Sequence, residues 1–199
     1  MFDKTIAPTR EKILRVAAKL FSESGYKQVT TRDIAAVVGI KSASIYYHFS
    51  SKNEILRSLY KFYTEERCKA TPDLSALLKL AETAPPHEVL MKCDFQYDEE
   101  VRELLDQILV TAAREIGVDP DSEAFIKDNI FDSVTSLFRP LIERMVELKK
   151  IKPLNIDDFI NVLTYYRFGA AALSKSSFGN IHSKYLADLY YIFSLIMPT

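Results

Sequence analysis

The stretch that most constrains the fold is residues 30–53, whose apolar spacing indicates two short helices joined by a tight turn. Ile34 begins an apolar helical face, and the neighbouring Ala35 is small enough to let a second helix approach. Gly39 follows, where a glycine ends a helix at little cost by adopting the left-handed conformation. Ile45 is then placed to pack back against the first helix. This order of small residue, glycine and aliphatic residue is typical of a helix-turn-helix.

The polar residues of this stretch are placed for contact with nucleic acid. Thr30 is the expected N-cap of the first helix, which leaves Thr31 and Arg32 at its positive end, where phosphate binds. Ser42 is the expected N-cap of the second helix, over 44–49, whose start reaches base edges in the major groove. The residues that follow can donate hydrogen bonds to phosphate oxygens. The DNA-binding candidates are Thr30, Thr31, Arg32, Lys41, Ser42, Ala43, Ser44, Tyr46, Tyr47, His48 and Lys52.

A family resemblance covers roughly the first third of the chain. The residues that carry it are Thr30-Thr31-Arg32-Asp33-Ile34-Ala35, Val38-Gly39-Ile40, Ser44-Ile45-Tyr46-Tyr47-His48-Phe49, Ser51-Lys52 with Glu54 and Leu56, and upstream Ile13-Leu14, Ala17-Ala18, Leu20-Phe21 and Gly25-Tyr26. In this combination the chain resembles the DNA-binding end of TetR-type transcriptional regulators. Ala43 stands where that family often has glycine or proline.

The resemblance implies an all-α protein of about nine helices, with a helix-turn-helix DNA-binding domain over 1–52 and a helical effector-binding and dimerisation domain over 53–199. It implies a homodimer whose recognition helices lie in successive major grooves of a palindromic operator. The expected function is that of a repressor, released when a small apolar or amphipathic effector binds the helical body. The sequence does not distinguish repression from activation.

The distribution of charge agrees with a DNA-binding N-terminal third. Residues 1–69 carry 13 lysines and arginines against 7 aspartates and glutamates, a net charge of +6. Residues 70–199 carry 13 against 20, a net charge of −7, so the chain as a whole has a net charge of −1. A basic segment on an acidic body directs positive surface to one place.

The remaining helices are expected from helical spacing and from start and stop signals. Thr9 is the expected cap of a first helix that Gly25 ends, and Ser51-Lys52-Asn53-Glu54 is a capping box that opens a helix to about residue 70. Pro140 predicts a kink or a split in a long helix over about 122–150. The other expected helices lie over about 74–81, 98–116, 156–174 and 183–197, and a short helix around 89–91 is expected to bury Val89, Leu90 and Met91.

The last two expected helices are apolar over more than one face. A helix that is apolar all round is buried all round, and in a chain of this size a second subunit is one way to bury it. We therefore expect these helices to form a homodimer interface as a four-helix bundle. The interface candidates are Phe159, Leu163, Leu186, Leu189, Tyr190, Phe193 and Met197.

Aromatic residues and methionine in the body suit an apolar effector pocket. Each of them fits equally well as ordinary core, because aromatic side chains at helical spacing are mostly buried in packing. The effector-binding candidates are Met91, Phe95, Phe125, Phe131, Phe138, Tyr165 and Tyr166.

No catalytic constellation, phosphate-binding glycine loop or metal-ligand spacing is present in the sequence, so we expect no enzyme activity, no cofactor and no metal. The three histidines, at 48, 87 and 182, are far apart. The N-terminal residues lack the apolar segment of a signal peptide and no long uncharged apolar run occurs, so we expect a cytoplasmic protein. Two other classes stay open: a helical ligand-binding or structural protein without sequence-specific DNA binding, and a helical enzyme.

Overall fold

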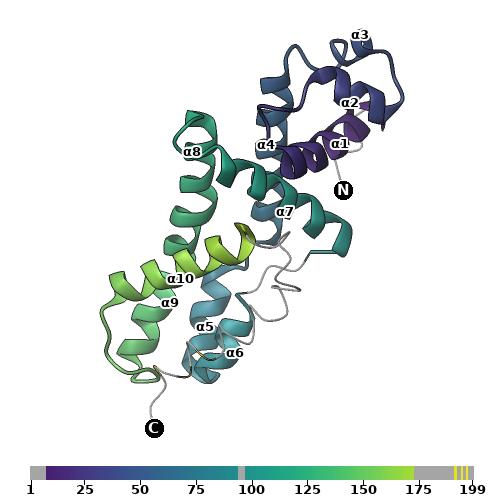
Figure 1. Cartoon of the computed structure of the whole chain (residues 1–199). Coiled ribbons are helices and arrows are strands. Elements are labelled where there is room, and N and C mark those ends of the chain that lie inside the picture. Colours follow the sequence, from purple (N-terminus) through teal and green to yellow (C-terminus); the bar gives the residue numbers. More distant parts are fainter. Residues whose placement is uncertain (1–7, 94–96, 173–190, 192–193, 195, 197–199) are drawn as a thin grey trace. The chain divides into compact units, whose positions relative to one another are not determined.

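The computed structural model describes residues 8–93, 97–172, 191, 194 and 196, and these residues form helices and no strand (Figure 1). The all-α class expected from the sequence is thereby confirmed. The expected helix over 183–197 lies outside the described residues.

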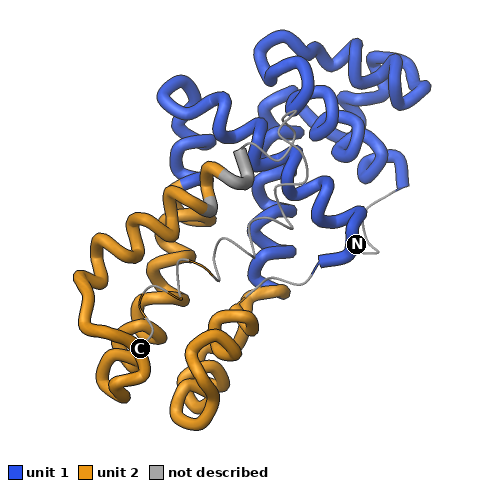
Figure 2. Tube along the Cα trace, turned by 60° about the horizontal axis from the view of Figure 1, so that its bottom comes forward, with its two compact units in different colours: residues 1–69, 97–126 blue, residues 70–96, 127–199 orange. Residues whose placement is uncertain are grey.

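The chain divides into two compact units, coloured separately in Figure 2. The first unit, residues 1–69 and 97–126, contains α1 (Pro8–Ser24), α2 (Thr31–Val38), α3 (Ser42–Ile45), α4 (Lys52–Ala70), α7 (Glu99–Arg114) and α8 (Pro120–Ile126). The second unit, residues 70–96 and 127–199, contains α5 (Leu74–Thr83), α6 (Pro86–Met91), the π-helical segment η1 (Lys127–Phe131), α9 (Asp132–Glu147) and α10 (Ile156–Ala172). The predicted boundary between a DNA-binding domain over 1–52 and an effector-binding domain over 53–199 is a division by function, and it stays a prediction.

Helix α1 is the centre of the first unit, because it packs against both α2 and α7. Ile13, Ala17 and Phe21, which recur at helical spacing, are fully buried, and Leu20 is half-buried. Each large side chain buried in this way contributes about 1.5–3 kcal/mol. The other fully buried large side chains of this unit are Leu14, Ile34, Ile45, Phe49, Ile55, Leu56, Leu59 and Ile108.

The start of α1 differs from the prediction. The helix begins at Pro8, so Thr9 lies inside its first turn rather than at the cap. Proline suits a first helical position, because its backbone lacks the N–H that would have no partner there. The end of α1 is as predicted: Gly25 has φ 87° and its N–H donates to the carbonyl of Phe21 at 2.9 Å.

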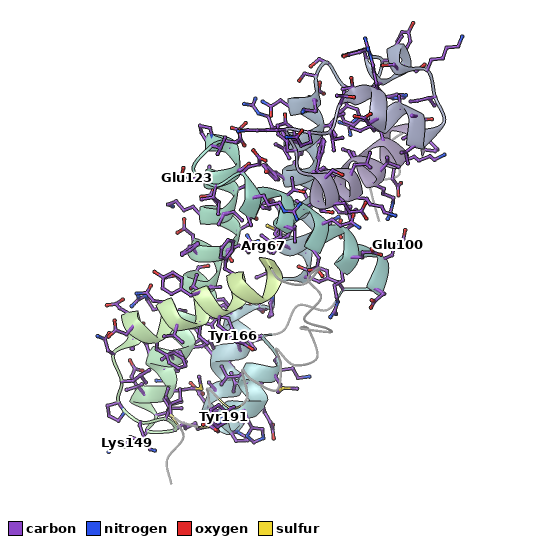
Figure 3. All side chains as sticks on the ribbon, in the orientation of Figure 1. Arg67, Glu100, Glu123, Lys149, Tyr166 and Tyr191 are labelled. Carbon is purple, nitrogen blue, oxygen red and sulfur yellow. The ribbon has the colours of Figure 1, made fainter. Side chains whose placement is uncertain are left out.

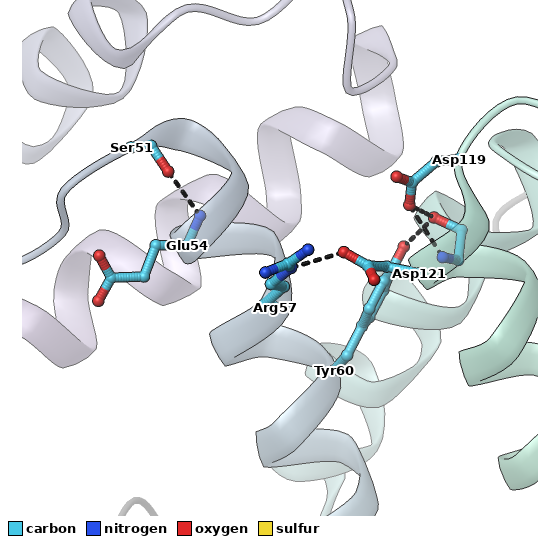
Figure 4. A network of polar contacts seen from close by, with 7 residues as sticks. Ser51, Glu54, Arg57, Tyr60, Asp119 and Asp121 are labelled. Atoms are coloured by element: carbon cyan, nitrogen blue, oxygen red, sulfur yellow. Dashed lines mark hydrogen bonds and ion pairs between the residues drawn. The ribbon is translucent and has the colours of Figure 1, made fainter.

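Helix α4 is fixed to α8 by a buried polar chain (Figure 4). The Tyr60 hydroxyl lies 2.7 Å from Ser122 Oγ, which in turn donates to Asp119 Oδ2 at 2.5 Å. Burial raises the pKa of the Tyr60 phenol well above its usual range. Next to this chain, Arg57 and Asp121 form an ion pair on the surface, a kind of contact worth about 0–1 kcal/mol.

Aromatic packing reinforces the same contact between α4 and α8. The rings of Tyr60 and Phe125 stack with centroids 4.3 Å apart, and Tyr63 meets Phe125 edge-on at 5.0 Å. Such ring pairs add about 0.5–1.5 kcal/mol each beyond the area they bury. The polar chain and the stacked rings together hold α4 in a single orientation within the first unit.

The second unit is built around α9, which packs against α5 and α10. Its buried face comprises Val134, Leu137, Phe138, Leu141, Ile142 and Met145. On the surface, Arg144 pairs with Glu82 of α5 at 2.9 Å, and Arg139 pairs with Asp157 of α10. These ion pairs thus join α9 to α5 and to α10.

The long helix expected over 122–150 is interrupted, but not at Pro140. Helix α9 continues through Pro140, and the interruption is the π-helical segment Lys127–Phe131. A proline inside a helix costs about 3 kcal/mol. The buried residues on both sides of Pro140, Phe138 and Leu141 among them, hold the helix together in spite of that cost.

Three smaller expectations have different outcomes. The helix expected over 98–116 is α7, Glu99–Arg114, and Asp98 is its N-cap, whose carboxylate accepts the N–H of Val101 at 2.8 Å. Met91 is exposed rather than buried, because α6 is a short surface helix that buries Val89. Helix α10 is not buried all round in the single chain, since Val162 is 52% exposed.

Gly39→Ala is expected to lower the free energy of unfolding by about 1–2 kcal/mol, because a side chain at φ 82° is strained against its own backbone. A Cβ at this position would meet no atom within 4 Å, so crowding adds nothing. Gly39→Asn is the control, since asparagine tolerates this conformation better. Urea unfolding measures both losses, and equal losses would contradict the assignment to backbone strain.

The buried Tyr60 phenol predicts a loss of stability at alkaline pH. An unfolded tyrosine ionises near pH 10, whereas the raised pKa keeps the folded phenol protonated, so the free energy of unfolding falls as pH rises above about 10. Tyr60→Phe is expected to cost about 1 kcal/mol at pH 8 and to make this alkaline fall smaller. Urea unfolding at pH 8 and pH 10.5 measures both effects. Tyr47→Phe, at an exposed ring, is the control and should leave the pH dependence as in the parent.

Candidate nucleic-acid interface

The start of α2 is fixed by a reciprocal pair of side-chain contacts, which confirms the expected cap at Thr30. Thr30 Oγ1 accepts the N–H of Asp33 at 3.2 Å, and Asp33 Oδ2 accepts the N–H of Thr30 at 2.8 Å. The hydrogen bonds from the Thr30 side chain and backbone hold the pKa of the Asp33 carboxyl below its usual range. Thr31 and Arg32 follow in the first turn, where the backbone N–H groups suit an anion.

The turn after α2 is held by backbone and side-chain contacts. Gly39 has φ 82°, and its N–H and that of Ile40 both donate to the carbonyl of Ala35, at 2.9 and 3.0 Å. The Lys12 ammonium of α1 donates to the carbonyl of Val38 at 2.9 Å. The last turn of α2 is therefore tied to α1 just before the chain enters α3.

The second helix of the motif begins earlier and is shorter than predicted. It spans Ser42–Ile45, and its N-cap is Lys41, with no side-chain cap, rather than Ser42. The chain then continues in turns through residues 46–48. Ile45 and Phe49 are buried, and their packing fixes the position of the short helix. The side chains of residues 41–44 and 46–48 are exposed or half-buried.

The predicted DNA-binding residues lie on this surface with different degrees of exposure. Tyr47 is 88% exposed and Tyr46 is 57% exposed. The exposed members of the set also include Thr30, Arg32, Lys41 and Ala43, and the half-buried members are Thr31, Ser42, Ser44, His48 and Lys52. The fold thus brings the whole set to α2, α3 and the residues next to them, while their contacts with DNA stay a prediction.

One contact links the two helices of the motif at the surface. Thr31 Oγ1 lies 3.3 Å from the Tyr46 hydroxyl. The pair joins the first turn of α2 to the residue after α3. A phosphate at the start of α2 would therefore meet two hydroxyl groups that are already close together.

Lys52 has partners that the sequence did not predict. Its ammonium donates to the carbonyls of Tyr26 and Val29, at 2.8 and 2.9 Å, and lies 4.3 Å from the centroid of the Tyr26 ring. Burial lowers the pKa of this ammonium, and the negative charge of Glu115 partly opposes the shift. Two of the three donors of this lysine are thus engaged inside the protein.

Arg10 and Lys12 of α1 contact the helix-turn-helix and the residues next to it. The sequence alone did not predict a role for either residue. The Arg10 guanidinium lies 4.4 Å from the centroid of the Phe49 ring and donates to Ser58 Oγ at 3.2 Å. Both residues are cations on α1, outside the helix-turn-helix itself. Their partners lie 26 to 48 residues away, so no local pattern could have identified them.

The carboxylates of this segment are used at helix starts. Asp33 caps α2 with Thr30, as described above, and Glu54 accepts the N–H of Ser50 at 2.5 Å. The expected capping box at the start of α4 is only half present. Ser51 Oγ accepts the N–H of Glu54 at 3.1 Å, but Glu54 turns to Ser50 rather than to the cap residue.

The effector candidates do not all lie in one unit. Phe125 belongs to the first unit, where it packs against α4, whereas Phe131, Phe138, Tyr165 and Tyr166 belong to the second. The Phe131 ring lies 6.1 Å from that of Tyr165, Phe138 is buried in the core, and Tyr166 is half-buried on α10 (Figure 3). Met91 is exposed, and Phe95 lies outside the described residues.

The dimer candidates fall largely outside the structure that can be described. Phe159 is half-buried and Leu163 is fully buried within the single chain, where it is part of the core around α9. The other candidates, Leu186, Leu189, Tyr190, Phe193 and Met197, lie outside the described residues.

In the part of the chain that the structure describes, no group of histidine, cysteine, aspartate or glutamate side chains is arranged to hold a metal ion. Nor does any described helix combine the length and the apolar character needed to cross a membrane.

Thr30→Ala is expected to lower the free energy of unfolding by about 1 kcal/mol, because α2 loses its side-chain cap. Hydrogen exchange of the amides of residues 31–33 should also become faster. Thr30→Ser keeps the capping oxygen and should stay close to the parent. Urea unfolding and amide exchange measure the two effects, and an alanine variant as stable as the serine variant would contradict the cap.

The segment that contains the predicted DNA-binding residues is similar to known proteins. Residues 13–59 match the model of the family described as bacterial regulatory proteins, tetR family. Over 59 residues the chain is 37% identical to the HTH-type transcriptional repressor KstR2 of Mycolicibacterium smegmatis, covering 30% of this chain and 29% of that protein. Over 52 residues it is 50% identical to the biofilm operon icaADBC HTH-type negative transcriptional regulator IcaR of Staphylococcus aureus, covering 26% of this chain and 28% of that protein.

These matches span less than a third of the length of either relative. The likeness of fold extends much further. A bacterial regulatory protein in the tetR family from Rhodococcus RHA1 has a similar structure, with a TM-score of 0.68 and 17% sequence identity, covering 98% of this chain and 100% of that chain. Residues 13–59 thus match the tetR family model, and nearly the whole chain shares the fold of a protein of that family.

Proposed function

We propose that the protein is a transcriptional regulator that binds double-stranded DNA through α2 and α3. The observation that carries this proposal is the surface formed by residues 30–48. There, Arg32 is exposed in the first turn of the capped helix α2, and Lys41, Tyr46 and Tyr47 are exposed at the two ends of α3. Exposed cations, hydroxyl groups and helix N–H groups are the donors that proteins use for phosphate oxygens.

The docking follows from the positions of the two helices. The start of α3, with Ser42, Ala43 and Ser44, enters the major groove and meets base edges. Lys41 just before α3, and Thr31, Arg32, Tyr46, Tyr47 and His48, contact the phosphates on either side and fix the register. Phosphate contacts set position and carry no sequence information themselves, so sequence preference rests with the α3 residues.

The protein acts as a homodimer on a palindromic operator. A two-fold dimer places two copies of α3 about one DNA turn apart, which matches the symmetry of such a site. The exposed side of α10, where Val162 lies, supports an interface between two copies on this helix. The names of KstR2 and IcaR describe negative regulators, which supports repression as the sign of the effect.

A small apolar or amphipathic effector relieves the repression by binding the helical body. The rings of Phe131, Tyr165 and Phe168 lie near one another in the second unit and support a ligand of this class. An effector acts by binding the DNA-free conformation more tightly than the DNA-bound one, and that difference in affinity is all that release requires.

A gel shift with the DNA upstream of the protein's own gene, run beside a sizing column, tests the proposal. A salt-sensitive shift by a dimer would support it and would supply an operator for effector screening. If neither this fragment nor random genomic fragments shift, the protein is instead a helical ligand-binding protein without DNA-binding function.

Removing an exposed cation should reduce the salt dependence of DNA binding. Each lysine or arginine that neutralises a phosphate releases a counterion, and the slope of log K against log salt changes by about 0.9 per contact. Arg32→Gln and Lys41→Gln are each expected to lower the slope, with Lys79→Gln on α5 as the control. Fluorescence anisotropy at several KCl concentrations measures the slopes, and slopes equal to that of the parent would contradict the phosphate roles.

A further inference from the structure

Lys52, the first residue of α4, holds its charge toward the protein rather than toward solvent. Its ammonium donates to the carbonyls of Tyr26 and Val29 and lies against the Tyr26 ring. The side chain is half-buried, whereas Arg32 and Lys41 are exposed. A lysine that reaches for phosphate is expected to resemble the exposed pair, so the geometry of Lys52 points to a different task.

The two carbonyls that Lys52 contacts belong to the loop between α1 and α2. That loop is fixed to α1 at its first residue, where the N–H of Gly25 bonds to the carbonyl of Phe21 at 2.9 Å, and the Tyr26 ring meets the Phe21 ring edge-on at 5.1 Å. At its other end, Val29 directly precedes the cap that starts α2. The ammonium therefore joins the start of α4 to the point from which α2 departs.

The turn between α7 and α8 places a negative charge near the Lys52 ammonium. Glu115 is buried there, and its charge favours the protonated form of Lys52 against the effect of burial. Burial and the charges of Asp119 and Glu115 raise the pKa of the neighbouring Tyr26 phenol. The ammonium thus has two carbonyl acceptors, a ring face and a nearby carboxylate, all of them inside the first unit.

We propose that Lys52 is a positioning residue, which sets the angle at which α2 and α3 are presented to DNA and does not itself neutralise a phosphate. By tying the loop before α2 to the start of α4, it fixes the helix-turn-helix to the helix that leads out of it. This inference rests on the proposed DNA-binding function, and it concerns how α2 and α3 are held in the orientation that binds DNA.

Lys52→Met tests the role, because methionine keeps an unbranched apolar stem and removes both the charge and the donors. The full chain and its variants are titrated at 10 °C against a fluorescein-labelled 40-base-pair duplex of mixed sequence, over a series of KCl concentrations. We expect an affinity loss of about fivefold or more with the salt slope of the parent. In the free protein, the Tm should fall by about 3 °C or more.

Arg32→Gln and Lys41→Gln are the matched controls. Both side chains are exposed, so these variants should show a slope lower by about 0.9 and an unchanged Tm. Lys52→Gln is a second variant that keeps N–H donors without charge. It should recover part of the affinity lost in Lys52→Met, still with the parental slope.

Two patterns would overturn the positioning role alone. A slope lower by about 0.9 with an unchanged Tm would make Lys52 a phosphate contact like the controls. A lower Tm with unchanged affinity and slope would leave it a contributor to stability with no effect on DNA binding. If the parent chain does not bind the duplex at any salt concentration, the proposed function fails, and the positioning role fails with it.

Discussion

The packing of α1 is the interaction on which the rest of the first unit depends. Its buried face, Ile13, Ala17 and Phe21 among others, meets α2 on one side and α7 on the other. Helices as short as α2 and α3 gain little from their own hydrogen bonds, and burial against a longer helix is what keeps such elements folded. The candidate DNA-binding surface is therefore held in place by residues that do not belong to it. This dependence also explains why the compact unit includes α7 and α8, which come much later in the sequence.

Polar contacts then determine how the short helices are oriented on that support. Each of the carboxylates Asp33 and Glu54 accepts backbone N–H groups near a helix start, so both are used locally and their charges are partly compensated. Lys12 and Lys52 donate to backbone carbonyls at the two ends of the α2 region. Cations such as Arg32 and Lys41 are left exposed to solvent. A surface of this kind attracts phosphate even though the whole chain carries a net charge of −1.

The features that the sequence could predict are those set by neighbouring residues. The cap at Thr30 and the left-handed Gly39 follow from local rules, and the structure has both. The partners of Lys52 lie 23 and 26 residues away, and only the folded loop brings their carbonyls together. The π-helical segment Lys127–Phe131 was not predicted from the sequence, and α9 continues through Pro140 instead of splitting there. Residue type identified the candidate DNA-binding set, but its division into exposed and engaged side chains required the fold.

Hydrogen exchange of the full chain, with and without a DNA duplex, shows whether α2 and α3 form the DNA-binding surface. If they do, exchange in residues 30–48 slows on adding DNA, with little change in α5 and α9 of the second unit. Exchange that slows only in the second unit would contradict a DNA-binding role of α2 and α3, and so would unchanged exchange in residues 30–48 under conditions where the duplex is bound.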